Sequence, residues 1–452
     1  MLKEAVAYYH ELLQDFELAE QSRRALDDGL ERAKLIFGGR PLSPYLRPHF
    51  VTAADWARVT VICETVWSAL QKVKDAAVES EALLDELGIT EIEKELVAID
   101  PKYRMVSPNA RLDSFLTETA YSYVELNGES PAGVAYADSA SEIFLELPVM
   151  RKFLERYDVE TFSGRPKMLE VLLGCYEEFL GRQPEHKPVI AIVDLKDLPT
   201  QKEFELFKEY FESKGYTSLI CSPEELEFDD GKLSYEGVAI DIVYKRLLVN
   251  EYLPIMDEYP ALLDAYKAGA ICMVNSFRSK LVHKKAIFAV LTNEKYAHLF
   301  DASELEAIRA HVPWTRKFRE ERTYNSGEEI DLIEWTRQNA HKLVLKPNDD
   351  YGGHGIYIGW NSTVHQWDEA IRVALEDGDY LVQERVETSK ELFPYLEQNG
   401  KIHMLEQLVD LDPLLFNGRV GSAFTRLSTT ELANVSSGGG MVPTFIISEK
   451  EA

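Results

Sequence analysis

Residues 343–356 read LVLKPNDDYGGHGI, and this stretch predicts a phosphate-binding hairpin. An apolar strand ends in Lys346, a polar turn with three glycines in four positions follows, and residues 356–358 return to strand. Glycines let backbone N–H groups approach phosphate oxygens closely because no Cβ stands in the way, and the lysine adds a positive charge. An ordinary glycine-rich hairpin with an incidental lysine is the alternative. The candidate phosphate ligands are Lys346, Gly352, Gly353 and Gly355.

Length and composition describe an ordinary globular protein. At roughly 150 residues per domain, 452 residues suggest about three domains. The net charge of −28, from 49 basic and 77 acidic residues, argues against general binding to nucleic acids or anionic membranes. A local basic pocket can still bind a small anion.

Cysteine usage and the N-terminal segment bear on the compartment. The four cysteines lie far apart in the sequence and show no metal-binding spacing, so we expect reduced thiols in a cytoplasm. Residues 1–20 carry five acidic residues and no apolar run, which predicts that they are not a signal peptide. No stretch approaches the roughly 18 apolar residues of a membrane helix.

Residues 1 to about 100 are predicted to be mostly helical, and residues 101–145 change to strand. The alternation in Tyr121–Asn127 places Glu125 and Asn127 on one side of a strand, and an extended residue 111–115 segment does the same for Arg111 and Asp113. Carboxylate and amide oxygens suit Mg²⁺ bound jointly with nucleotide phosphates. A salt-bridged surface hairpin is the alternative.

A βαβ unit is predicted after a helical stretch at 148–182. Residues 189–194 and 217–221 are strands flanking an amphipathic helix, a hairpin follows around residues 229–231, and residues 238–244 form another strand. No glycine fingerprint follows the first strand, so we expect no dinucleotide site. Arg246 follows the last strand and is a candidate for an anionic substrate, although an exposed basic pair with Lys245 is equally compatible.

The rest of the chain forms a third module. A helix is expected to carry Lys284 and Lys285, and the apolar strand at 380–386 turns polar midway. That strand offers apolar faces and backbone amides for an adenine ring. Further strands are predicted at 402–411 and 421–428, and a flexible loop at 436–440.

These segments together resemble the circularly permuted ATP-grasp proteins, a group that includes the ligase fold of glutathionylspermidine synthase. The resemblance covers roughly residues 100–446. In ordinary ATP-grasp enzymes, a Glu-x-Asn metal strand follows the lysines and the glycine loop. Here Glu125-Leu126-Asn127 precedes Lys285 by more than 150 residues, the order expected after permutation.

The resemblance implies roles for individual residues. Arg111 meets the transferred phosphoryl group, and a substrate carboxylate uses Arg246 or Arg278. Lys285 rather than Lys284 contacts ATP. The implied metal ligands are Asp113, Glu125 and Asn127, and the implied ATP-binding residues are Lys285, Lys346, Gly352, Gly353, Gly355, Gln383 and Glu384.

The implied fold is an α/β ATP-grasp fold. We expect a helical region at 1–100, permuted metal-binding strands plus helices at 101–184, a pre-ATP-grasp domain at 185–274 and a nucleotide-binding domain at 275–452. The implied activity is an ATP- and Mg²⁺-dependent carboxylate–amine ligase that forms an acylphosphate and releases ADP and phosphate.

Its substrates would be a small carboxylate and an amine, both of the amino-acid or peptide class. The sequence does not identify them. A homo-oligomer is compatible with the sequence. A dikinase-like phosphotransferase and an inactive nucleotide-binding regulator are the alternative functions.

Overall fold

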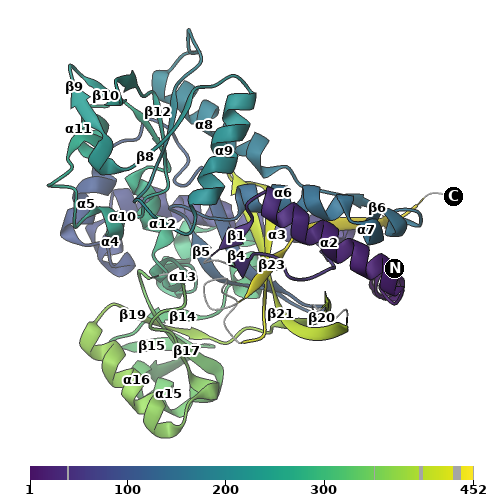
Figure 1. The fold of residues 1–452 in the computed structure, drawn as a ribbon. Coiled ribbons are helices and arrows are strands. Elements are labelled where there is room, and N and C mark those ends of the chain that lie inside the picture. The colour runs from purple at the N-terminus through teal and green to yellow at the C-terminus, as the bar shows by residue number, and fades with distance from the viewer. Residues whose placement is uncertain (38–39, 351, 397–400, 431–438, 451–452) are drawn as a thin grey trace.

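The computed structural model describes the chain except for residues 38–39, 351, 397–400, 431–438 and 451–452. Figure 1 shows three parts: a central sheet, a parallel sheet above it and a smaller lobe below it. The expected loop at 436–440 lies mostly outside the described residues.

The central sheet has the order β23-β22-β21-β4-β5, with β20 paired to β21. It joins strands from residues 109–127 to strands from residues 389–442. The expected strand at 121–127 is confirmed, and residues 111–115 are extended as expected. Its strands are β4 (Asn109–Leu116), β5 (Tyr121–Asn127), β20 (Ser389–Leu396), β21 (Ile402–Phe416), β22 (Arg419–Ser428) and β23 (Gly440–Val442).

The upper part is the predicted βαβ unit, extended to four parallel strands in the order β13-β12-β7-β8. The expected strand at 238–244 is interrupted at residues 240–241, where the Asp241 carboxylate accepts the N–H of Val189. Residues before the interruption pair in a small β11-β10-β9 sheet instead. The elements are β7 (Ile190–Val193), α9 (Gln201–Ser213), β8 (Ser218–Cys221), β9 (Glu227–Asp229), β10 (Lys232–Tyr235), β11 (Val238–Ala239), β12 (Ile242–Lys245), α10 (Val249–Tyr252), α11 (Ala261–Lys267) and β13 (Cys272–Val274).

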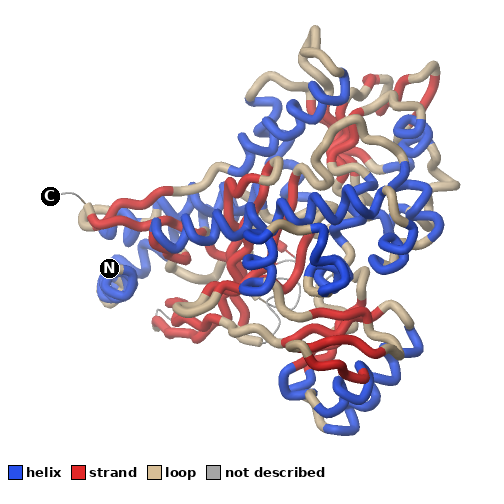
Figure 2. Tube along the Cα trace, turned by 180° about the vertical axis from the view of Figure 1, so that it is seen from behind, coloured by secondary structure: helices blue, strands red, loops and turns tan. Residues whose placement is uncertain are grey.

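The lower lobe holds the glycine-rich hairpin in an antiparallel sheet of order β14-β19-β17-β18. Its helices lie on the side away from the central sheet, in both views (Figures 1 and 2). One of them starts at a Thr363–Gln366 capping box and buries Trp367 against the sheet. The elements are β14 (Thr315–Lys317), β15 (Arg322–Asn325), β16 (Glu328–Asp331), α15 (Leu332–Gln338), β17 (Leu343–Pro347), β18 (Tyr357–Ile358), α16 (Val364–Asp377) and β19 (Tyr380–Glu384).

The expected single helix around Lys284 and Lys285 is wrong. Helix α12 (Lys280–His283) stops, Lys284 is extended with ψ 131°, and α13 (Ala286–Leu291) starts after Lys285. Asn348 causes the break, because its backbone and side-chain oxygens accept the N–H groups of Lys285 and Ala286. Helix α14 (Ala302–His311) follows.

Residues 1–100 are mostly helical, as expected, but they do not stand apart. Strand β3 (His49–Thr52) pairs in parallel with β24 (Thr444–Glu449). The stretch at 148–182 also contains a strand, β6 (Tyr157–Glu160), on the other side of β24. None of the three strands was predicted, because their pairing joins segments that lie far apart in the chain. The helices are α1 (Leu2–Leu12), α2 (Phe16–Arg32), α3 (Ala53–Val78), α4 (Glu81–Leu87), α5 (Glu91–Ala98), α6 (Val134–Glu146), α7 (Pro148–Phe153) and α8 (Gly164–Leu180).

The described part of the chain has no helix with the length and apolar character needed to cross a membrane. All four cysteines are buried and unpaired with one another.

Candidate active site

Two neighbouring strands carry the predicted acidic set. In the β4–β5 ladder, Arg111 lies opposite Asn127 and Asp113 lies opposite Glu125. The Arg111 guanidinium donates to both oxygens of Asp113, at 2.7 and 3.0 Å, and the Asn127 amide donates to Asp113 at 3.0 Å. The structure therefore brings all four residues together.

Three further charged residues join this set, and the sequence analysis missed them. Asp113, Asp410 and Asp412 each place one oxygen within 4.8 Å of the others, and all three are buried. The Arg426 guanidinium pairs with all three acids, at 2.6 Å to Asp113 and 2.9 Å to Asp412. The sequence offered a signal for two of them, because the alternation Asp410-Leu411-Asp412 places both acids on one face of a strand.

Burial and charge pairing act in opposite directions on the pKa values of these acids. Burial alone would raise the pKa of Asp113, but the Arg111 and Arg426 guanidiniums lower it to about 2. Burial raises the pKa of Asp410 and Asp412 despite Arg426. For Glu125, burial is outweighed by Lys285, which helps to lower the pKa. Asp113 and Glu125 are therefore carboxylates at neutral pH, able to bind a cation.

The two predicted phosphate lysines face the acidic set from the other side. The Lys285 ammonium lies 3.2 Å from Glu125 and donates to the carbonyl of Asp350 in the glycine-rich turn. The Lys346 ammonium donates to the carbonyl of Val124 at 3.2 Å. Burial lowers the pKa of Lys346 to about 8, although Glu125 opposes the shift. Lys284 points elsewhere, with its ammonium 2.8 Å from Glu93.

The glycine-rich turn between β17 and β18 needs its glycines. Gly352, Gly353 and Gly355 have φ of 73°, 80° and 66°, a region that side chains disfavour. A Cβ on Gly355 would also lie 2.8 Å from the Tyr380 hydroxyl oxygen. The conformation of this turn therefore requires glycine at these positions.

Gln383 and Glu384 lie at the end of β19, opposite Val344 and Leu343 at the start of β17. The Gln383 side chain accepts from Lys346 at 2.8 Å and donates to Thr315 at 3.0 Å. Glu384 accepts from Asn325 at 3.2 Å. The strand thus combines an apolar interior with polar groups at its end, as expected.

The two candidate substrate arginines separate. Arg246 is buried, donates to the carbonyl of Pro131 at 2.7 Å, and leaves its Nε without a hydrogen-bond partner among the described residues. The Arg278 guanidinium instead binds the carbonyl of Val97 at 3.0 Å and lies 3.4 Å from Asp100. These contacts hold Arg278 against the end of α5, and they do not support its predicted role in substrate binding.

One cavity of about 590 Å³ connects these groups. It is lined by residues of the glycine-rich turn, the end of β19, the β4–β5 pair and the region of Asp194 and Arg246. Burial raises the pKa of Asp194 to about 7. The predicted site residues that line the cavity are Arg111, Asp113, Glu125, Asn127, Arg246, Lys346, Gly352, Gly353, Gln383 and Glu384.

No protein-family model matches the sequence. A glutathione synthetase-like effector from Globodera pallida, solved without ligand, superposes with a TM-score of 0.62 at 15% identity, over 96% of this chain and 99% of that one. The fold is glutathione synthetase-like. A γ-glutamylcysteine synthetase-like protein from Methylobacillus flagellatus aligns with a TM-score of 0.40 at 10% identity, over 86% of each chain.

One curated relative matches by sequence. A Frankia casuarinae protein provisionally named glutamate–cysteine ligase 2-2 is 22% identical over 454 residues, which cover 95% of this chain. The chain spans about half the length of this relative, 49%.

Proposed function

We propose that this protein is an ATP-dependent carboxylate–amine ligase of the ATP-grasp type, which forms an amide bond through an acylphosphate. One observation carries the proposal: Lys346, the glycine-rich turn, the acids of β4 and β5 and the buried Arg246 line a single cavity, and the Lys285 ammonium lies 3.2 Å from the lining residue Glu125. A triphosphate and a carboxylate substrate need cationic, metal-binding and carboxylate-binding groups of these kinds in one cavity.

The comparisons support a ligase in general terms. The fold is that of a glutathione synthetase-like protein, and the curated relative carries a ligase name. We further propose a permuted chain order, since the acids of β4 and β5 precede the lysines in sequence yet face them in space.

The acidic set fits Mg²⁺, because all of its donors are hard oxygens. Asp113, Glu125 and Asn127 would hold the ion, with Asp410 and Asp412 beside them. Bound there, Mg²⁺ would neutralise charge on the phosphates of ATP. The Arg426 guanidinium shares the same acids and would balance their charge when no nucleotide is bound.

The chain's own residues then have distinct tasks. Lys346 and Lys285 bind phosphate oxygens, and the turn glycines admit the phosphates to the backbone N–H groups. Arg111 stabilises the phosphoryl group as the substrate carboxylate attacks it. Arg246 orients that carboxylate through its unpartnered Nε. An amine then attacks the acylphosphate carbonyl carbon, phosphate leaves, and the amine loses a proton.

A substrate screen tests the proposal. Purified protein is incubated with Mg·ATP and pairs of amino acids, peptides and polyamines, starting with glutamate and cysteine because of the relative's name. We expect ADP, phosphate and an amide product by mass spectrometry, and far less of each from Glu125→Gln at limiting Mg²⁺. Formation of AMP would instead indicate a dikinase, and no nucleotide turnover with any pair would indicate a regulator.

A further inference from the structure

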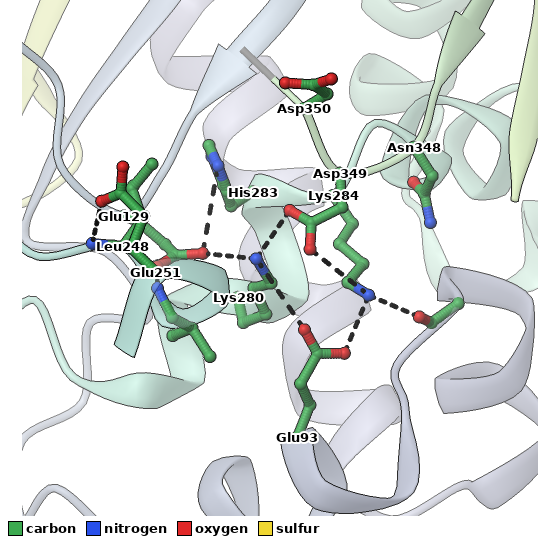
Figure 3. Close-up of polar contacts among 12 residues, drawn as sticks. Glu93, Glu129, Leu248, Glu251, Lys280, His283, Lys284, Asn348, Asp349 and Asp350 are labelled. Carbon is green, nitrogen blue, oxygen red and sulfur yellow. Dashed lines mark hydrogen bonds and ion pairs between the residues drawn. The ribbon is translucent and has the colours of Figure 1, made fainter. Parts of the chain in front are cut away.

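Six buried or half-buried charged side chains meet beside the glycine-rich turn. Figure 3 shows Glu93, Glu129, Lys280, Lys284 and Asp349 among them. We call the six side chains the lysine–carboxylate network. Its members come from α5, the end of β5, the end of β12, α12, the α12–α13 junction and the turn after β17. They are Glu93, Glu129, Lys245, Lys280, Lys284 and Asp349.

Asp349 connects the network to the nucleotide end of the cavity. It stands three residues after Lys346, and its carboxylate lies 2.6 Å from Lys280 and 3.7 Å from Lys284. The preceding Asn348 accepts the N–H groups of Lys285 and Ala286, and its amide donates to the carbonyl of Leu87 at 3.0 Å. The first turn of the loop is thus fastened both to the α12–α13 junction and to α4.

The two lysines are held in turn by carboxylates from other parts of the chain. The Lys284 ammonium lies 2.8 Å from Glu93 and donates to the carbonyl of Gly88 at 2.6 Å. The Lys280 ammonium lies 3.0 Å from Glu129. Glu129 also accepts the N–H of Val249 at 2.7 Å. Helices α4 and α5 therefore reach the turn through one lysine, and the central sheet reaches it through the other.

The cost of burying these charges makes the arrangement specific. Three cations and three anions balance one another, whereas removal of one leaves a partner charged and uncompensated. Glu93, Glu129 and Lys280 are each at most 2% exposed, so water cannot replace a lost partner. The network consequently tolerates one placement of Asp349 far better than others.

We propose that Asp349 and Glu93 are positioning residues for the glycine-rich turn and the lysines beside it. Through Lys280 and Lys284, they fix Lys346 and Lys285 at the distance from Glu125 that a metal-bound triphosphate requires. This assigns the N-terminal helices a task in nucleotide binding. The inference rests on the proposed function only in taking the ligand to be an adenine nucleotide.

The test compares Asp349→Asn and Glu93→Gln with wild type, using Glu95→Gln as a matched control. Glu95 is exposed on the same helix, α5, two residues from Glu93. Affinity for Mg·ADP is measured by calorimetry, which needs no catalysis. We expect affinity to fall about tenfold or more in Asp349→Asn, less in Glu93→Gln, and not at all in the control.

Two readouts separate positioning from plain stability. In steady-state assays the KM for ATP should rise while the KM values for the acid and amine stay unchanged, whereas a smaller folded fraction would lower kcat alone. The double variant Glu93→Gln/Lys284→Met should bind no worse than Lys284→Met, since Glu93 acts through that lysine. Asp349→Glu, which keeps the charge, should recover part of the lost affinity.

Several outcomes would overturn the inference. Wild-type Mg·ADP affinity in both folded variants would do so, as would parallel changes in all three KM values. If neither variant folds, the network is purely structural and the inference also fails. If wild type binds no adenine nucleotide, the proposed function fails first, so the two failures are distinguishable.

Discussion

The Lys346 ammonium should make nucleotide affinity fall with rising pH above neutrality. Its pKa in the free site is about 8, because burial disfavours the charge. A bound triphosphate places negative charge beside the ammonium and should return the pKa to at least its ordinary value of 10.5. Phosphate binds the protonated form of Lys346. Below pH 8 the lysine already carries this proton, whereas above pH 8 the protein must take up a proton when the nucleotide binds, which lowers the affinity.

The two pKa values set the size of the effect. With about 8 in the free site and 10.5 in the complex, linkage predicts that Mg·ADP affinity falls about 30-fold between pH 7 and pH 9.5. Calorimetric titrations at four pH values across this range measure it directly. Lys346→Arg is the matched control, since a guanidinium stays charged throughout and should give a flat profile. Circular dichroism checks that both proteins stay folded.

The reasoning would be refuted by a wild-type affinity constant to within about twofold over this range, well below the change that linkage requires. It would also be refuted if Lys346→Arg titrated like wild type, because another group would then carry the pH dependence.

Three further predictions concern the acidic set. Arg111→Lys should lower turnover by roughly 10³-fold with little change in nucleotide affinity, because a lysine cannot form the paired hydrogen bonds; near wild-type turnover would reduce Arg111 to a partner of Asp113. Glu125→Gln should raise the Mg²⁺ concentration for half-maximal activity, and an unchanged Mg²⁺ titration would remove it as a ligand. Arg426→Ala should lower the free energy of unfolding by about 3–5 kcal/mol in urea titrations, because it leaves buried carboxylates uncompensated. Added Mg²⁺ should recover part of that loss, and an unchanged urea midpoint would contradict the pairing.

Local periodicity in the sequence predicted many individual elements. Strict alternation gave β5, the βαβ unit around α9 follows from apolar strands flanking an amphipathic helix, and the β17–β18 hairpin follows from its glycines. The pairs Arg111–Asp113 and Glu125–Asn127 also followed, because side chains two apart on a strand share a face. Each of these inferences needs only neighbouring residues.

Where the prediction failed, distant residues decide the structure. The sheet formed by β3, β24 and β6 joins residues 49–52, 444–449 and 157–160. A local sequence pattern does not predict pairing between strands so far apart in the chain. The helix expected around Lys284 and Lys285 ends early because Asn348, more than 60 residues away, takes the N–H groups that would continue it.

The sequence alone determined which side chains could carry charge and which of them share a strand face. Only the tertiary structure decided which faces meet. Pairing of β21 with both β4 and β22 brings Asp410, Asp412 and Arg426 to Asp113, some 300 residues away in the chain. The tertiary structure also decided that Arg246 lines the cavity, whereas Arg278 binds the carbonyl of Val97. The physical reason is that strand register and helix packing depend on burying the whole apolar surface at once, whereas periodicity reports only on neighbours along the chain.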